Sequence, residues 1–130
     1  MSKRGGVVFT VGRDLFFLPA EVAVQVLPVP ELARVPGAPS DVVGVALVTG
    51  AMVPVVTLNA SFRTGRSRHS EPMIVCLHES ERIGLVGLEV RATGTFEVEN
   101  EDDALFQGEI ARRFDVAAVV DGVPKGRWVV

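Results

Sequence analysis

The chain has 130 residues, enough for one compact domain or for two very small subdomains that share a core. Apolar residues make up 48% and charged residues 22%, which favours a globular core and excludes a disordered chain. The net charge of −3 gives no basis for a nucleic-acid partner, and a single cysteine, Cys76, excludes an internal disulfide and is typical of a reduced, cytoplasmic setting.

The first part of the chain predicts short strands that end at turns or prolines. Gly6 to Val11 is an apolar, β-branched run, Gly12 to Asp14 is a turn, and Leu15 to Leu18 is the returning strand. A single turn followed by a strand is expected over Glu21 to Leu27. The stretch from Pro28 to Pro39 is rich in proline, which excludes a helix and predicts a loop over the surface.

An uncharged stretch of 21 residues lies between Asp41 and Arg63. Its length alone would allow it to cross a bilayer. However, Gly50 in its middle supplies a turn, and Pro54 would remove a backbone hydrogen bond from a helix. The stretch therefore predicts a buried hairpin with strands Val42 to Val48 and Ala51 to Leu58, whose two apolar faces are both covered by the rest of the chain.

The second half predicts further short strands separated by polar turns. Residues 64–71 read as an exposed basic loop, and residues 97–103 as an exposed acidic loop. The expected strands are Met73 to Leu77, Ile83 to Val90, Gly94 to Val98, Val116 to Val120 and, after an Asp121-Gly122 turn, a last strand to Val130. Short strands with regular turn signals predict an all-β barrel or pair of barrels.

The two halves echo each other weakly. A strand, a polar turn, a strand and a Glu-Val pair occur over residues 7–22 and again over residues 73–90. This pattern predicts two similar subdomains, each of which completes the core of the other. The alternative is that apolar hairpins simply look alike.

No catalytic site is predicted. Cys76 and His78 lie two residues apart, so on a strand they share a face and could form a thiolate–imidazole pair. The ordinary alternative is a buried core cysteine beside a histidine at the end of a strand. A metal site would need two more ligands, and the local candidates lack ligand spacing: His69, Glu79 and Glu81. We therefore expect no enzyme activity, no cofactor and no metal.

A basic cluster leaves one other function open. Arg63, Arg66 and Arg68 could hold an anion, which would make the protein a small β-barrel module that binds a ligand or an anion. The ordinary alternative for such a run of charge is a solvated loop.

The central part of the sequence resembles the CheW family, the coupling proteins of bacterial chemosensory arrays. The resemblance rests on a proline-glycine loop with Pro36 and Gly37, then Val-Gly-Val around Gly44, Thr49-Gly50, and the Val-Pro-Val-Val-Thr-Leu run around Pro54. It extends over nearly the whole chain, and we treat residues 6–130 as a single domain of two subdomains.

This resemblance implies a fold, partners and a site. The fold would be two small, intimately packed, SH3-like five-stranded β-barrels without catalytic activity. The partner would be the cytoplasmic tip of a chemoreceptor, and further candidates are the regulatory domain of a CheA-type histidine kinase and other CheW-like proteins. Nucleic-acid binding and membrane insertion are not expected. The receptor would contact Ala23, Val24, Gln25, Val26, Thr49 and Gly50. The kinase would meet a second barrel built from the Met73 to Val98 strands and the hairpin from Val116 to Val130.

The sequence departs from the family at charged positions. The arginine of the family's Asn-Leu-Arg-Gly turn is replaced by Thr49, and the glutamate of the strand after the first hairpin is replaced by Gln25. Two family aspartates are replaced by Thr57 and Leu88. The chain also ends at Val130, where the family usually continues through a strand and a helix. We therefore expect a divergent, shortened member, similar to the FrzB type, that acts as an accessory subunit with a receptor contact and a weakened kinase contact.

Overall fold

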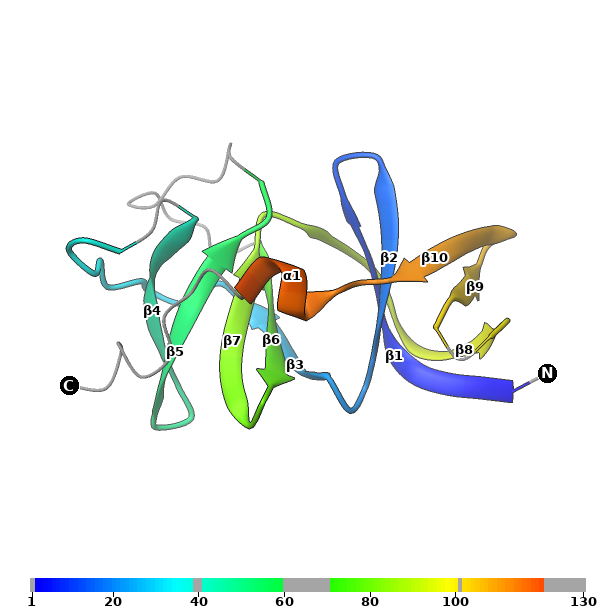
Figure 1. Ribbon diagram of the computed structural model, residues 1–130, viewed down its shortest axis with the longest axis horizontal. Coiled ribbons are helices and arrows are strands. Elements are labelled where there is room, and N and C mark those ends of the chain that lie inside the picture. Colours follow the sequence, from blue (N-terminus) through cyan, green and yellow to red (C-terminus); the bar gives the residue numbers. More distant parts are fainter. Residues whose placement is uncertain (1, 39–40, 60–70, 101, 121–130) are drawn as a thin grey trace.

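The computed structural model describes residues 2–38, 41–59, 71–100 and 102–120, and it confirms the predicted all-β class (Figure 1). The described part contains ten strands and one short helix. Their bounds are β1 (Ser2–Val11), β2 (Asp14–Pro19), β3 (Ala23–Pro28), β4 (Val42–Val48), β5 (Ala51–Thr57), β6 (Pro72–His78), β7 (Glu81–Val86), β8 (Glu89–Val98), β9 (Ala104–Phe106), β10 (Glu109–Arg113) and α1 (Val116–Val120).

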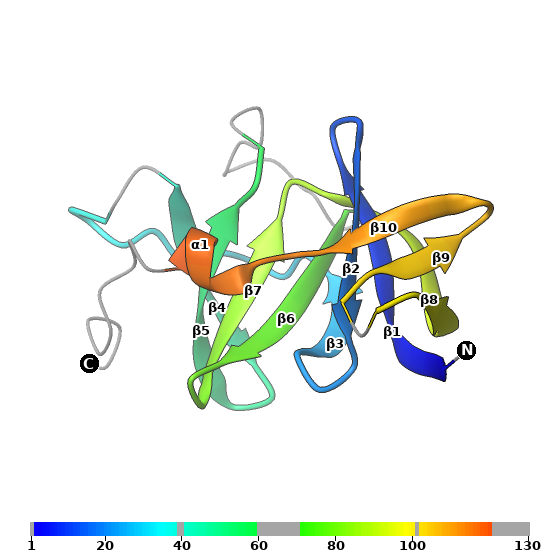
Figure 2. The ribbon, with the colours of Figure 1, turned by 45° about the vertical axis from the view of Figure 1, so that its right-hand side comes forward.

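The strands form two sheets of five. The first is a closed barrel in the order β1-β2-β10-β9-β8, which we call barrel A, and the pairing of Val98 with Ala104 closes it. The second, which we call sheet B, has the order β3-β6-β7-β5-β4. Figure 1 shows barrel A on the right and sheet B on the left, with α1 in front of sheet B. Helix α1 contacts β6, so the chain after β10 runs from one sheet to the other (Figure 2).

The two sheets have equivalent topology, and each combines a hairpin from one half of the chain with three strands from the other half. Hairpin β1–β2 starts barrel A, and hairpin β6–β7 has the same place in sheet B. The strand after each hairpin crosses over, so that β3 pairs with β6 and β8 pairs with β1. The sequence echo therefore corresponds to a structural one. The predicted second barrel is wrong in its membership, because β8 does not pair with β6 or β7 and instead pairs with nine residues of β1, from Ser2 to Thr10.

The core has three layers, and the two sheets share the middle one. The middle layer lies between the sheets and takes residues from β1 to β7 and α1, among them Phe9, Val56 and Ile74. A second layer lies on the far side of sheet B, and a third fills barrel A. Strand β6 is apolar almost throughout because both of its faces are buried. Ile74 and Cys76 face the middle layer, while Met73 and Val75 face the second layer, on the far side of sheet B.

The central hairpin is formed by β4 and β5, as predicted, but its two faces are not both covered. Val53 and Val55 are fully buried, whereas Leu47 is 67% exposed and Met52 is 51% exposed. These two residues are direct cross-strand partners near the turn. Strand β4 is an edge strand of sheet B, so the outer face of the hairpin tip remains open. No helix in the described part of the chain is long and apolar enough to cross a membrane.

Two further strand predictions need correction. The predicted strand Ile83 to Val90 is interrupted, because Gly87 has φ +77° and an added Cβ would lie 2.8 Å from Thr57 Oγ1. Residues 116–120 form helix α1 in place of a strand, since Asp115 Oδ1 accepts a hydrogen bond from the Ala118 N–H at 3.4 Å, as a helix cap does. The Asp121-Gly122 turn and the last strand lie outside the described residues.

Candidate functional site

The motif residues of the proline-glycine loop and of the hairpin shape the backbone around β4. Gly44 has φ +154°, and an added Cβ would lie 2.7 Å from the carbonyl oxygen of Ala33. Ala33 and Val45 exchange backbone hydrogen bonds of 2.9 and 2.8 Å, so the loop packs directly on β4. Glycine at position 44 is therefore required by close approach of the backbone.

Pro36, Gly37 and Pro54 also have local roles. Pro36 and Gly37 form an exposed turn, in which Gly37 has φ +78° and the Ala38 N–H donates to the Val35 oxygen at 3.2 Å. Pro54 is buried opposite Val45, and the ladder between β5 and β7 begins one residue later, at Val55. Proline has no backbone N–H to donate to a ladder of hydrogen bonds. Pro54 precedes the first pair between β5 and β7, so the parallel ladder does not need a donor from it. All the motif residues therefore have structural explanations.

The predicted receptor-binding residues of β3 are mostly exposed. Ala23 is buried, while Val24 is 44% exposed, Val26 is 37% exposed and Gln25 between them is also exposed. Strand β3 is an edge of sheet B, and its register with β6 shifts between Ala23 and Gln25. A β-bulge at an edge re-aims side chains, which accounts for three consecutive exposed residues where simple alternation would bury one.

The other predicted receptor-binding residues form the turn of the central hairpin. Thr49 has φ +47° and Gly50 has φ +82°, and both are exposed. Two central residues with positive φ are typical of a type I′ turn, which matches the twist of the flanking strands. A β-branched residue rarely adopts this conformation, so Thr49 is under local backbone strain. The exposed Leu47 and Met52 lie on either side of the turn.

The structure places both groups of residues at the same end of sheet B. Ala23 at the start of β3 pairs with Cys76, close to the turn between β6 and β7. Strands β5 and β7 run parallel with Val55 opposite Gly84, which puts the turn of Thr49 and Gly50 beside the β6–β7 turn. Figure 1 shows both turns at the lower end of sheet B. In sheet order, however, β3 and β4 are opposite edges.

The start of β3 is anchored to barrel A. Arg4 on β1 forms an ion pair with Glu21, which lies between β2 and β3. A backbone hydrogen bond at Glu21 is the largest cause that lowers the pKa of its carboxyl group, and the charge of Arg4 lowers it further while desolvation opposes both. The Ala20 N–H also donates to the Gly5 oxygen at 2.9 Å. The segment where the chain passes from barrel A to sheet B is therefore held in place on β1, directly before the exposed residues of β3.

The residues considered for catalysis do not form a reactive site. Cys76 is fully buried in the middle layer, and this burial raises the pKa of its thiol to about 12. The thiolate that a nucleophilic mechanism requires is therefore absent near neutral pH. The described residues contain no group of three or more His, Cys, Asp or Glu that could hold a metal ion. His69 and the basic cluster of Arg63, Arg66 and Arg68 lie outside the described residues.

Sequence reasoning named Val24 and Val26 as contact residues, but it missed the other exposed apolar side chains. Within the described part of the chain, six large apolar residues are exposed, and five of them lie on sheet B: Val24, Val26, Leu47, Met52 and Leu77, with Ile110 on barrel A. The strands that carry Leu47, Met52 and Leu77 are almost entirely apolar, so alternation could not separate the covered face from the open one.

Comparisons with known proteins place this geometry in a family. None of the curated proteins compared with the chain matches its sequence. Among solved structures, the crystal structure of the scaffolding protein TtCheW from Thermoanaerobacter tengcongensis is similar, with a TM-score of 0.67 and 16% sequence identity over 89% of this chain and 86% of that one. At this identity the likeness shows the fold. A family model described as the CheW-like domain matches residues 5–126. The chain therefore belongs to the CheW-like domain family.

Proposed function

We propose that this protein is a non-catalytic scaffold in a bacterial chemosensory array, that it acts in the cytoplasm, and that residues 6–130 work as one docking module. The observation that carries the proposal is the concentration of exposed apolar side chains on sheet B, combined with family membership. Exposed apolar residues at strand edges and turns are typical of protein interaction sites.

The proposed receptor surface is the end of sheet B with Val24 and Val26 on β3 and the turn of Thr49 and Gly50. A chemoreceptor tip would contact it through apolar side chains, because the charges that the family carries at positions 25 and 49 are replaced by neutral Gln25 and Thr49. Apolar contacts are screened little by salt, whereas exposed ion pairs are screened strongly. We therefore expect receptor affinity to change little with ionic strength.

Substitution in the turn tests this surface directly. Thr49→Asp adds a charge within the proposed interface, while aspartate tolerates positive φ, so the hairpin should still form. Gln107→Asp is the matched control, because Gln107 has φ +50° before Gly108 in the equivalent, exposed turn of β9–β10 on barrel A. In titrations against a purified receptor tip, we expect Thr49→Asp to weaken binding by about tenfold or more and Gln107→Asp to leave it unchanged. Full binding by Thr49→Asp, or a steep loss of wild-type affinity with added salt, would contradict the proposal.

The accessory role is the finer part of the proposal. Contact with the regulatory domain of a CheA-type kinase would be weak, because positions 57 and 88, where the family has aspartates, are neutral. Thr57 Oγ1 donates to the Asn59 oxygen at 2.7 Å, so its hydroxyl is engaged within the chain. Titration with the purified kinase regulatory domain tests this point, with a full-length family member as reference. Binding as tight as that of the reference would restore an ordinary coupling role.

A further inference from the structure

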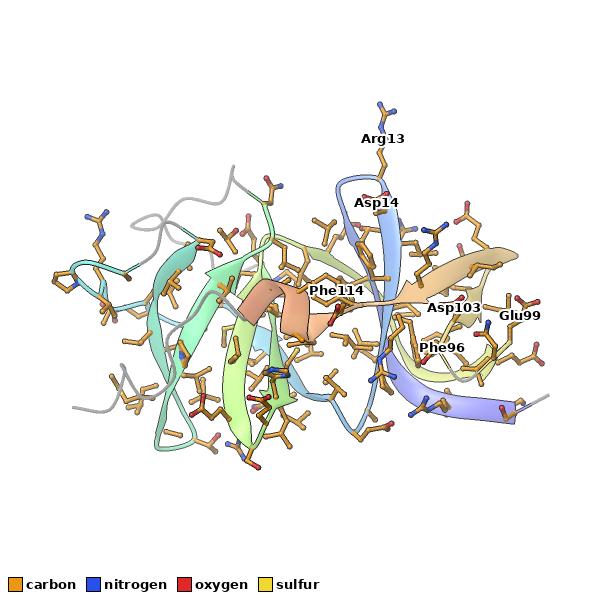
Figure 3. The ribbon with its side chains drawn as sticks, in the orientation of Figure 1. Arg13, Asp14, Phe96, Glu99, Asp103 and Phe114 are labelled. Atoms are coloured by element: carbon orange, nitrogen blue, oxygen red, sulfur yellow. The ribbon has the colours of Figure 1, made fainter. Side chains whose placement is uncertain are left out.

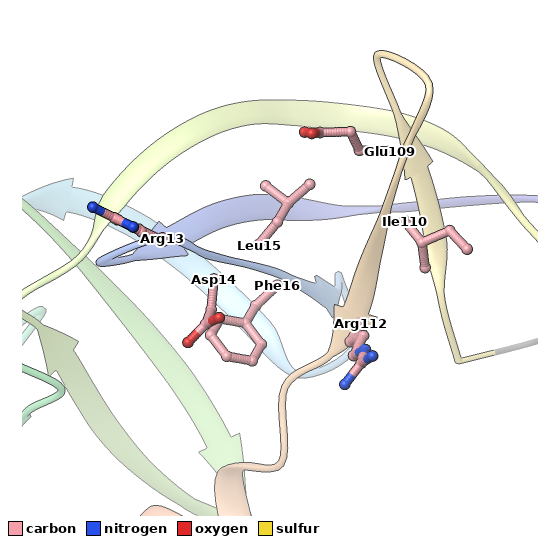
Figure 4. A pocket seen from close by; sticks show the side chains of 7 residues that line it. All are labelled: Arg13, Asp14, Leu15, Phe16, Glu109, Ile110 and Arg112. Atoms are coloured by element: carbon pink, nitrogen blue, oxygen red, sulfur yellow. The ribbon is translucent and has the colours of Figure 1, made fainter.

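An open cleft of about 500 Å³ lies in barrel A, between the turn ends of β2 and β10 (Figure 4). Strands β2 and β10 run parallel here, and their ladder consists of Arg112 with Phe16 and Arg113 with Phe17. One further backbone bond, from Phe114 N to Phe17 O at 2.9 Å, continues the seam away from the turns. Toward the turns the two strands separate, and the cleft occupies the space between them.

Backbone polar groups from both strands face this opening. The closing pair of hairpin β1–β2 is Val11 with Asp14, across a two-residue turn, so the neighbouring Leu15 directs its N–H and C=O away from β1 and toward β10. The parallel pair of Arg112 with Phe16 uses the Leu15 C=O as acceptor, so the Leu15 N–H is the group that faces the opening. The closing pair of hairpin β9–β10 is Phe106 with Glu109, and by the same alternation Ile110 directs its N–H and C=O toward β2. In the described ladder Ile110 has no partner on β2. The cleft is therefore an opened seam between two strand edges.

The side chains around the seam combine apolar contact with balanced charge. Leu15 is partly buried against the interior of barrel A, and Figure 4 shows Glu109 on the same side of the strands. Phe16 lies on the other side with Asp14 and Arg112, while Ile110 is 51% exposed at the rim. Arg13 lies on the turn, and its side chain projects away from the barrel in Figure 3. The lining therefore has two cations, Arg13 and Arg112, and two carboxylates, Asp14 and Glu109.

The backbone groups and the side chains that line the cleft favour an extended peptide as its ligand. Unsatisfied strand edges pair readily with an additional extended chain, and main-chain hydrogen bonds then supply affinity while side-chain pockets supply specificity. The balanced charge favours neither a polyanion such as nucleic acid nor a polycation. A strand rises about 3.3 Å per residue, so about three residues would fill the stretch from Arg13 to Phe16.

We propose that this cleft binds an extended segment of a partner protein, which enters the seam between β2 and β10 as an added strand. The segment pairs with the backbone of Leu15 and Ile110, places an apolar side chain against Leu15 or Phe16, and carries both an acidic and a basic residue for Arg112, Asp14 and Glu109. The site lies on barrel A, away from β3 and the turn of Thr49 and Gly50. It thus goes beyond receptor docking, and its failure would leave that proposal untouched.

The test uses the whole chain and a defined probe. The probe is an array of capped seven-residue peptides in which apolar residues alternate with charged ones, and the peptides that bind are titrated into ¹⁵N-labelled protein. We expect the amide signals of Leu15 and Ile110 to shift and to exchange more slowly with solvent. Ile110→Pro removes the inward N–H, and loss of one such hydrogen bond should weaken peptide binding about fivefold to tenfold.

Met52→Pro is the matched control. Met52 follows the β4–β5 turn as Ile110 follows the β9–β10 turn, and it is equally exposed at 51%. This variant should bind peptide like the wild type. If Ile110→Pro fails to fold, slower exchange of the Leu15 and Ile110 amides in the wild type with peptide decides the question. The proposal is overturned if no peptide binds, if the shifts fall on β3, or if both proline variants lose binding equally. Binding of inorganic phosphate alone, or a dimer with the cleft closed by a second copy, would also overturn it.

Discussion

Neighbouring residues on β5 allow a sharp test of the layered core. Val53 is fully buried in the second core layer with Met73 and Val75, while its neighbour Met52 is half exposed. Val53→Ala removes two methyl groups, which is about 1.6 kcal/mol of lost transfer free energy. The space left between packed strands adds up to about 1 kcal/mol, so the free energy of unfolding should fall by about 2 to 2.5 kcal/mol. For a domain of this size that corresponds to a decrease of roughly 8 °C in Tm.

The measurement is urea denaturation of wild type, Val53→Ala and Met52→Ala, followed by circular dichroism. Met52→Ala removes a larger side chain but should cost less than about 1 kcal/mol, since half of that side chain already lies in water. The slope of unfolding free energy against denaturant should be the same for all three proteins. Equal losses for the two variants, or a near-neutral Val53→Ala, would refute the assignment of Val53 to a closed core and the division of the hairpin into covered and open parts.

Two other predictions concern strain and thiol chemistry. Thr49→Asn should raise the free energy of unfolding by about 0.5 to 1 kcal/mol, because asparagine accepts the positive φ of the type I′ turn that threonine resists; a lower Tm would count against it. Cys76 should resist iodoacetamide at pH 8 in the folded protein and react at once in urea, since burial raises the pKa of its thiol to about 12. The folded pKa lies above the unfolded value of about 8.5, so stability should fall as pH rises above that value, more in wild type than in Cys76→Ala; equal slopes would contradict the burial argument.

Sequence reasoning succeeded where strand propensity, apolar pattern and turn chemistry agreed. The hairpin with Thr49 and Gly50 at its turn and the hairpin β1–β2 around Gly12 both combine β-branched runs with glycine in a positive-φ turn. These local signals need no information from distant parts of the chain. The all-β class and the family followed from them.

The sequence could not show what depends on distant contacts. Strands β9 and β10 lie in a charged region, and only the glycine at 108, in a two-residue turn, marks their hairpin. The crossing of β8 to β1 follows from pairing over a long stretch that local patterns do not encode. The valines of α1 favour a strand by propensity, but the Asp115 cap and the packing of Val116 into the middle layer decide for a helix. The exposed faces of β3 and of the hairpin tip depend on which edges other strands leave open.

The arrangement of the strands gives the molecule a property that suits a scaffold. Strands β3 to β7 form sheet B, while barrel A combines β1 and β2 from the start of the chain with β8 to β10 from its second half, so barrel A cannot form without both parts of the chain. The middle layer, with Phe9 from β1 and Ile74 from β6, then fixes the two sheets against each other. The Phe9, Phe16 and Phe114 rings, with centroids 5.1 to 5.8 Å apart, extend this contact along the chain that leads from β10 to α1. A partner on β3 and a second partner in the β2–β10 seam would therefore be held at a fixed separation, because the interface between their sites is hydrophobic core and not a hinge.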